Sequence, residues 1–374
     1  MAEVDWSATV DPARLRATVE RLAAFHTRNT LSPTVHEAAA WLATELKSIR
    51  GVDVELMRYT LPQGPRVPEE REAVQVVAAL PGRSRTSILV GGHLDSLQAG
   101  ADPATARAPG ANDDATGVAA ALEAMRALST RKWQNTIIFA AVTGEEQGLL
   151  GSKALALRCR AEWAPIVAVL MNDTVGSTRG HSVRADRAKI RLFSEEFVGG
   201  DAPSHESREL ARYIEWVARG IPGFGVKLVF RPDRYGRGGD HTPFVKEGFS
   251  AVRFTEAYED YARQHTVDDV PERIDWHYLA NVARVNVRAM ASLAAAGPAP
   301  TEVEVDRSQG YDTTLKWGAT PGVSYAVYVR ETTSPVWECS FAAGGVSKWT
   351  VEGLNKDDHV FAVGAVGGVP VVAK

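Results

Sequence analysis

Four short apolar runs in this chain each lead to a histidine or an acidic residue, either directly or after a short loop. The runs have the length of β-strands and cover residues 87–90, 136–142, 166–171 and 250–254. Such runs are typical of the buried strands of a parallel sheet. In open α/β sheets, ligands bind outside the carboxyl ends of the strands. The pattern therefore predicts an α/β fold whose functional side chains gather along one edge of the sheet.

The side chains at this edge suit a metal ion. In chain order, those that follow the runs are His93 and Asp95, Glu145 and Glu146, Asp173, and His265. The polar loop 108–117, A-P-G-A-N-D-D-A-T-G, adds Asn112, Asp113 and Asp114 behind a proline and a glycine that break regular structure. Imidazoles and carboxylates that converge on one point are typical ligands of zinc or a similar metal.

Six motifs carry these residues in a fixed order. They are His93-x-Asp95, Gly110-x-x-Asp113-x-x-Thr116-Gly117, Gly144-Glu145-Glu146-x-Gly148-Leu149-x-Gly151-Ser152, Asn172-Asp173, Asp240-His241-Thr242-x-Phe244 and His265-Thr266-x-x-Asp269. H-x-D and E-E are common alone, but six motifs in order make coincidence a poor explanation. Over roughly residues 15–295, the chain resembles metallopeptidase family 28, the co-catalytic zinc aminopeptidases.

This resemblance implies a centre of two zinc ions, with other divalent metals as alternatives. Asp113 would bridge both ions, His93 and Asp173 would complete the first site, and Glu146 and His265 the second. From the residues alone Asp114 competes with Asp113, or serves as a carboxylate at a helix N-terminus. The family pattern places the ligand four residues before Gly117, which selects Asp113.

The resemblance also implies two catalytic residues. Glu145 would be the general base that activates a water bridging the two metals, and Asp95 would orient the imidazole of His93. Adjacent side chains of an extended segment point to opposite sides, so one acid of the Glu145-Glu146 pair can bind metal while the other faces the substrate. Gln264 stands where several relatives have a tyrosine that polarises the substrate carbonyl.

Four further residues near these motifs have expected roles. Asp240 and His241 are expected to support the site, with capping of a helix by Asp240 as the alternative. Asp269 braces His265, and Arg28 is an exposed side chain in a structured turn.

The function implied by the resemblance is hydrolysis of the N-terminal peptide bond of peptides. Three alternatives remain at this point. They are a single-zinc transferase like the glutaminyl cyclases, a family-20 type deacylase or carboxypeptidase, and a non-catalytic binding protein of the receptor type.

Composition limits partners and compartment. A net charge of −4 with mixed signs gives no basic surface for nucleic acid, and no apolar run approaches the length of a membrane span. The first residues have neither the basic nor the apolar part of a signal peptide. We expect a secreted or periplasmic protein whose signal is absent from this sequence, with a cytoplasmic protein as the alternative. Cys159 and Cys339 lie far apart and form no disulfide framework. Peptides are the expected partners, and the oligomeric state stays open.

Chain length and composition predict two domains. Residues 1–298 would form the catalytic domain, a mixed, mostly parallel sheet sandwiched by helices, with a cap inserted at about 179–239. After the linker Gly297-Pro298-Ala299-Pro300, residues 299–374 contain short β-rich runs and resemble a fibronectin type III module, which implies a small all-β sandwich.

Overall fold

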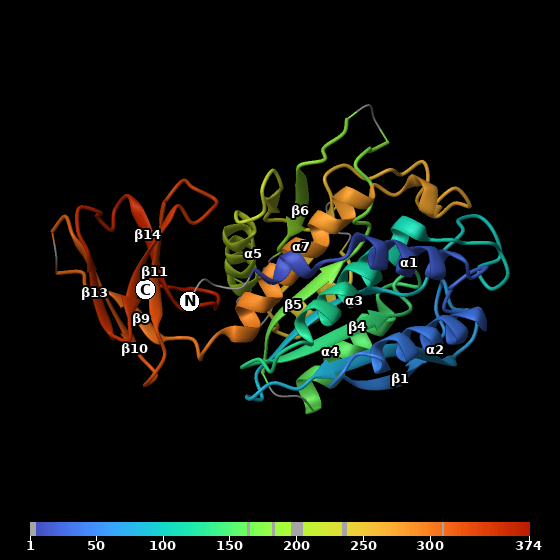
Figure 1. Ribbon diagram of the computed structural model, residues 1–374, viewed down its shortest axis with the longest axis horizontal. Helices are drawn as coiled ribbons and strands as arrows, with labels where there is room; N and C mark the ends of the chain where they lie inside the picture. The colour runs from blue at the N-terminus through green and yellow to red at the C-terminus, as the bar shows by residue number, and fades with distance from the viewer. Residues whose placement is uncertain (1–4, 163–164, 182–183, 196–204, 234–237, 309) are drawn as a thin grey trace.

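The computed structural model describes residues 5–374 except 163–164, 182–183, 196–204, 234–237 and 309. Its larger part is built on one eight-stranded sheet (Figure 1). From edge to edge the strands are β1 (Asp53–Leu61), β2 (Arg71–Leu80), β4 (Thr136–Val142), β3 (Ser87–His93), β5 (Ile166–Asn172), β8 (Ala251–Glu256), β6 (Lys189–Phe193) and β7 (Gly225–Val229).

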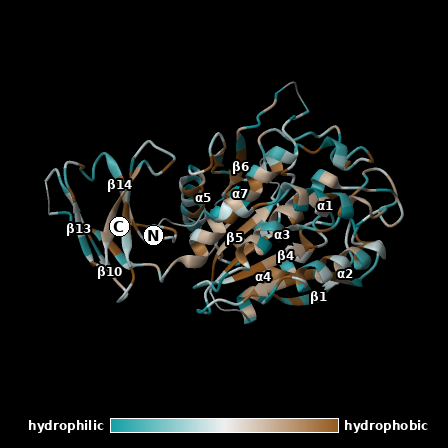
Figure 2. Ribbon diagram, in the orientation of Figure 1, coloured by the Kyte–Doolittle hydropathy of each residue, from teal (hydrophilic) through white to brown (hydrophobic). Residues whose placement is uncertain are grey.

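The strands at the centre of the sheet run parallel. Strands β4, β3, β5 and β8 are parallel neighbours, whereas β1, β2 and β4 pair antiparallel, as do β8 and β6. The predicted mixed, mostly parallel sheet is therefore confirmed. Its central strands are almost wholly apolar and buried, as Figure 2 shows by their brown colour.

Helices cover both faces of the sheet, and the period-two alternation of the strands sorts the core between them. On one face, Val90 and Phe139 pack in the core shared with α1 (Pro12–Ala23), α2 (Thr34–Lys47), α3 (Thr116–Leu128), α5 (His205–Ala218) and α7 (Trp276–Ala295). On the other face, Leu89 and Ile138 pack with α4 (Leu150–Glu162) and α6 (His241–Lys246).

The segment 179–239, which was expected to form a cap, contributes strands to the sheet in its described part. Strand β6 pairs with β8, and β7 extends the sheet beyond β6. In β6, Ile190 and Leu192 are buried while Lys189 and Arg191 alternate with them. The segment also supplies α5, which packs against β7 and α7. It therefore widens the sheet and the layer of helices on one face.

The C-terminal part of the chain forms two small antiparallel sheets, as expected for an all-β unit. One sheet has the strand order β13 (Lys348–Val351), β10 (Thr313–Gly318), β9 (Thr301–Val305). The other has β12 (Cys339–Gly344), β11 (Tyr325–Glu331), β14 (His359–Ala365), β15 (Val371–Val372). Between them lies a separate core that includes Leu315, Val327 and Val363.

The two parts of the chain share apolar core. Tyr328 of β11 makes edge contacts with Tyr213 and Trp216 of α5, with ring centroids 6.4 and 5.8 Å apart. Trp337 is fully buried in the same core, and Arg212 of α5 donates to the carbonyl of Pro335 across 2.9 Å. The β unit is thus packed firmly on α5 through aromatic contacts.

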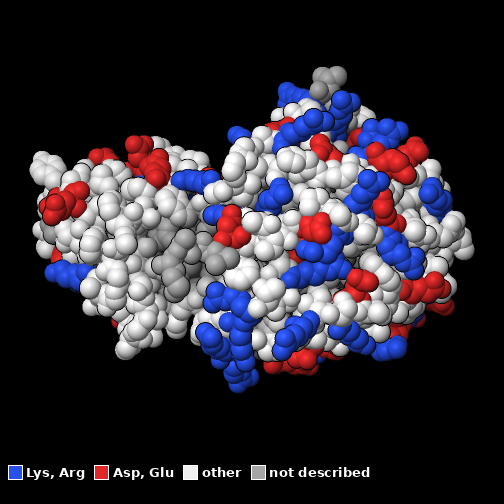
Figure 3. Space-filling view, viewed as in Figure 1, with Lys and Arg blue, Asp and Glu red and all other residues white. Residues whose placement is uncertain are grey.

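Two features of the chain bear on compartment and redox state. No helix within the described ranges is both long and apolar enough to cross a membrane. Cys159 and Cys339 are both free thiols. On the face seen in Figure 3, Lys and Arg side chains are interspersed with Asp and Glu over the larger part.

Candidate metal centre

The side chains singled out from the sequence meet at the carboxyl edge of the central strands. His93 is the last residue of β3 and Asp173 follows β5 directly. Glu145 and Glu146 lie in the turn after β4, and His265 lies in the loop after β8. Parallel neighbours end at the same edge, so the order of strands in the sheet brings these distant segments together.

The candidate ligand atoms form two groups that share Asp113. In the first group, Nε2 of His93 lies 3.0 Å from Oδ1 of Asp113 and 3.8 Å from Oδ1 of Asp173. In the second, Nε2 of His265 lies 3.1 Å from Oδ2 of Asp113 and 3.2 Å from Oε1 of Glu146. The atoms of each group lie within 4.8 Å of one another. Each oxygen of the Asp113 carboxylate thus belongs to a different group.

These atoms fit zinc ligands. Zinc binds nitrogen and oxygen at about 2.0–2.2 Å in tetrahedral geometry, which places neighbouring ligand atoms roughly 3.3 Å apart. The separations of 3.0–3.8 Å agree with that value. Oδ2 of Asp113 and Oε1 of Glu146 are buried, and among the described residues neither has a partner in hydrogen-bonding geometry. Buried carboxylate oxygens need such a partner or a cation.

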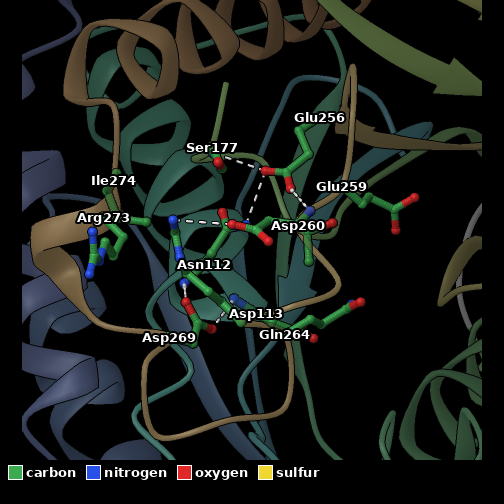
Figure 4. A pocket seen from close by; sticks show the side chains of 12 residues that line it. Asn112, Asp113, Ser177, Glu256, Glu259, Asp260, Gln264, Asp269, Arg273 and Ile274 are labelled. Carbon is green, nitrogen blue, oxygen red and sulfur yellow. Dashed lines mark hydrogen bonds and ion pairs between the residues drawn. The ribbon is translucent and has the colours of Figure 1, made fainter. Parts of the chain in front are cut away.

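Two other acidic residues, Asp269 and Glu256, fix the loop that carries Asp113 by accepting hydrogen bonds from it. Burial raises the pKa of Asp269 to about 7, and its carboxylate accepts hydrogen bonds from the backbone N–H groups of Asn112 and Asp113 at 2.8 and 2.9 Å. Glu256 accepts from the Asn112 amide at 3.0 Å. Figure 4 shows these contacts around a small cavity of about 20 Å³. Asp269 was expected to brace His265, but these hydrogen bonds fix the Asp113 loop instead.

Asp114 has a structural role, in agreement with its alternative interpretation. Its carboxylate accepts from the backbone N–H groups of Gly117, His93 and Thr174 at 3.0, 3.0 and 3.1 Å. A Cβ atom on Gly117 would lie 2.4 Å from this carboxylate, so only glycine leaves room for it. Asp114 therefore ties the first turn of α3 to the segments that carry two candidate ligands.

Asp95 contacts the imidazole of His93 through its backbone carbonyl. The Nδ1 atom of His93 lies 3.0 Å from the backbone carbonyl of Asp95 and 3.7 Å from its carboxylate. The carboxylate accepts instead from the backbone N–H groups of Glu145 and Glu146, at 3.4 and 3.2 Å. Asp95 thus orients the buried imidazole of His93 through its backbone carbonyl. Its carboxylate holds the Glu145-Glu146 turn.

Glu145 lies beside the ligand groups without belonging to either. It is half-buried and lines a cleft of about 750 Å³ together with both candidate histidines. The pair Glu145-Glu146 was expected on an extended segment; it occupies a turn, in which the Glu145 carbonyl accepts from Gly148 and Leu149. Burial raises the pKa of Glu145 well above its usual range, and the neighbouring charge of Glu146 adds to the effect while His93 opposes it. A carboxyl group of this kind suits proton transfer.

Two arginines that support the site were missed or misjudged from the sequence. Arg253 of β8 is buried and donates to Oδ2 of Asp173 at 3.0 Å and to Asp233 at 2.8 Å. Arg28 was expected to be exposed but is fully buried. It donates to the carbonyl of Leu94, between His93 and Asp95, at 2.8 Å. It also reaches the carbonyls of Leu22, Pro109 and Gly110.

The remaining expectations concern Asp240, His241 and Gln264. Asp240 occupies the N-cap position of α6, but its side chain makes no capping hydrogen bond with the described residues. Its carboxyl group is buried, burial raises its pKa to about 7, and the carboxylate of Asp173 is among the charges that act on it. His241 lies 3.3 Å from Glu195. Gln264 lines both the cleft and the cavity beside Asp113.

Backbone strain also concentrates here. Leu149, Thr174 and His265 adopt left-handed φ angles of 63°, 54° and 59°. His265 is a candidate ligand, Thr174 follows the candidate ligand Asp173, and Leu149 lines the same cleft. Non-glycine residues in this conformation persist where the surrounding structure enforces them, and they cluster at functional sites.

Comparison with known proteins finds a family model and several relatives similar to this chain. The pattern of the family described as "Peptidase family M28" matches residues 75–290. A protein of Pyricularia oryzae named "Probable zinc metalloprotease" is 38% identical over 96% of this chain and 80% of its own length. Among solved structures, the LapA aminopeptidase of Legionella pneumophila is similar with a TM-score of 0.61 and 18% identity, covering 78% of this chain and 74% of that one. A glutaminyl cyclase of Fimbriiglobus ruber is similar with a TM-score of 0.58 and 18% identity, covering 75% and 94%.

Proposed function

Because this chain belongs to peptidase family M28, and its similarity to zinc metalloproteases makes it a hydrolase that uses zinc, we propose that it is a di-zinc aminopeptidase. It would hydrolyse the N-terminal peptide bond of peptides. His93, Asp113 and Asp173 would hold one ion, and Asp113, Glu146 and His265 the other. Bound zinc would supply Lewis acidity that polarises the scissile carbonyl and lowers the pKa of the attacking water.

The chain's own side chains would carry the proton transfers and the alignment. Glu145 would take the proton of the attacking water and pass it to the leaving amine. Asp95 would hold the Glu145-Glu146 turn through the backbone hydrogen bonds described above. Arg253 would hold Oδ2 of Asp173, which leaves Oδ1 toward His93. Gln264 lines the cleft and would offer an amide donor to the substrate carbonyl, in place of a tyrosine.

The observation that carries the two-ion proposal is the division of the Asp113 carboxylate. One oxygen lies 3.0 Å from Nε2 of His93 and the other 3.1 Å from Nε2 of His265, which supports a carboxylate shared between two ions. This arrangement favours a di-zinc peptidase over a single-zinc transferase of the glutaminyl cyclase type, although the fold suits both. Zinc content of the purified protein, measured by mass spectrometry, should approach two per chain; a value near one would favour the transferase.

The variant Glu145→Gln tests the catalytic assignment. It keeps the size of the side chain and removes its basicity, so turnover of aminoacyl p-nitroanilides should fall about 10²–10⁴-fold while zinc content stays at the wild-type level. Asp113→Asn is the contrasting variant, because it should lower zinc content. Substantial hydrolysis by Glu145→Gln would overturn the role of the base. Activity on N-acyl amino acids in place of the p-nitroanilides would favour the deacylase alternative.

We further propose that residues 299–374 form a fibronectin type III-like sandwich after a catalytic domain at 1–298. The two sheets of three and four strands, with β9, β10 and β13 in one and the rest in the other, support this assignment.

A further inference from the structure

The cleft beside the metal centre carries one strongly basic side chain. Its described lining residues include the acids Asp113, Glu145, Glu146 and Asp173, and Arg66 is the only lysine or arginine among them. Arg66 lies in the loop between β1 and β2, on the rim of the sheet edge where the ligand groups meet. A cation at this position needs an explanation, because nothing in the proposed proton transfers uses it.

Arg66 is held in place by its loop and by the Glu145-Glu146 turn. Gly64 and Val67 exchange backbone hydrogen bonds of 2.9 and 3.1 Å around it, and the side chain of Val67 is buried. Nη1 of Arg66 donates to the carbonyl of Glu146 at 2.8 Å. This is its one hydrogen bond among the residues that the structure describes. The residue is exposed, so the remaining N–H groups of its guanidinium face the cleft or solvent.

We propose that Arg66 binds a carboxylate on the leaving part of the peptide substrate. This inference rests on the aminopeptidase function proposed above and names a substrate class for it. Guanidinium groups pair with carboxylates through two parallel N–H···O bonds, and a guanidinium anchored at one nitrogen has such donors to spare. The carboxylate would be the C-terminus of a short peptide or the side chain of an acidic residue after the scissile bond.

The position of Arg66 selects the leaving part over the N-terminal residue. Glu145 must contact the leaving amine to protonate it, so the peptide beyond the scissile bond passes the Glu145-Glu146 turn. Arg66 is bonded to the backbone of that same turn. The carbonyl oxygen that accepts from Arg66 and the candidate ligand atom Oε1 belong to the same residue, Glu146, so Arg66 lies close to the metal centre. An extended peptide gains about 3.3–3.6 Å per residue, so the carboxylate of a di- or tripeptide lies within one or two such steps of the scissile bond.

The test compares matched substrates on the zinc-loaded, full-length protein. Each pair carries the N-terminal residue that the p-nitroanilide panel selects. One pair is a dipeptide with a free C-terminal carboxylate and the same dipeptide as its amide. The other pair, both amidated, has aspartate or asparagine after the scissile bond. Wild-type protein should favour the free acid or the aspartate peptide, and the pair that shows the preference identifies the source of the carboxylate.

The variant Arg66→Gln should lower the preference about tenfold, mainly through a higher KM for the carboxylate substrate, because one charge-assisted contact contributes about that much. Arg66→Lys should keep part of the preference. Loss of the hydrogen bond to Glu146 would slow both members of a pair equally, so the ratio isolates carboxylate binding from bracing of the turn. Arg58→Gln is the matched control, since Arg58 is exposed on the same hairpin and pairs with Glu72; it should change neither rates nor ratios.

Three outcomes overturn the proposal in distinguishable ways. Equal slowing of both members of each pair in Arg66→Gln assigns Arg66 to bracing alone. Hydrolysis of p-nitroanilides without any wild-type preference for a carboxylate removes this inference and leaves the aminopeptidase function intact. Absence of hydrolysis of every peptide and p-nitroanilide by zinc-loaded protein removes both.

Discussion

Replacing Arg28 by methionine should destabilise the fold and weaken zinc binding together. The substitution keeps much of the side-chain length but removes the charge and every donor. Arg28 binds the carbonyls of Leu94 and Pro109 at 2.8 and 2.6 Å, and these two carbonyls accept from no other group among the described residues. Burial lowers the pKa of Arg28 to about 10, so the guanidinium is charged at neutral pH.

The magnitude follows from the groups left unpaired. A buried carbonyl that loses its partner costs about 1–3 kcal/mol, so two of them cost roughly 2–6 kcal/mol. Removal of a buried charge offsets part of this, because burying an ion costs several kcal/mol. We therefore expect a loss of about 2–4 kcal/mol in the free energy of unfolding.

The measurement is urea unfolding of zinc-free protein, followed by tryptophan fluorescence, since bound metal would add its own stabilisation. Arg50→Met is the matched control, because Arg50 is exposed at the end of α2. Zinc affinity, measured by competition with a chromophoric chelator, should fall in Arg28→Met, since Leu94 adjoins His93 and Pro109 precedes the Asp113 loop. A free energy of unfolding within about 0.5 kcal/mol of the control, the scatter of ordinary surface substitutions, would refute the reasoning.

Three further predictions follow from contacts described above. Arg253→Met should lower zinc affinity about 10–100-fold, because Asp173 loses the group that orients it; unchanged affinity in the chelator assay would contradict this. Burial raises the pKa of the Cys159 thiol to about 12 and shields it from reagents. Below that pH, Ellman's reagent should therefore modify only Cys339 in the native protein, and both thiols after unfolding in urea. Tyr328→Ala should cost about 3 kcal/mol and expose the segment before β9 to proteases, whereas proteolysis at the wild-type rate would argue against a tight contact with α5.

Much of the fold could be predicted because hydrophobic periodicity reports burial directly. The strands that lead to His93 and Asp173 begin and end within a few residues of the expected runs 87–90 and 166–171. Strand β6 was missed although K-I-R-L-F alternates apolar and charged residues, which is a usable signal for a strand with one buried face. Strand β12, C-S-F-A-A-G, has too few β-branched residues to stand out.

The candidate ligands could be found from the sequence, but their supports could not. Ligand residue types follow strand ends in a recognisable order. Arg28, in contrast, binds backbone carbonyls from distant segments, and a carbonyl leaves no trace in residue identity. Arg253 sits inside an apolar strand, where an arginine without a buried partner would be unfavourable; that anomaly was the available signal. The role of Asp95 depends on whether its side chain or its backbone carbonyl faces His93. The sequence does not distinguish these two conformations.

The aromatic contact between β11 and α5 makes the stability of the larger part of the chain depend on the C-terminal β unit. A fragment ending near residue 298 would expose the aromatic side chains of Tyr213 and Trp216 to solvent. Exposed apolar patches of this kind promote self-association. Attempts to express the peptidase half by itself, or to graft it onto another partner, should therefore carry compensating polar substitutions on α5.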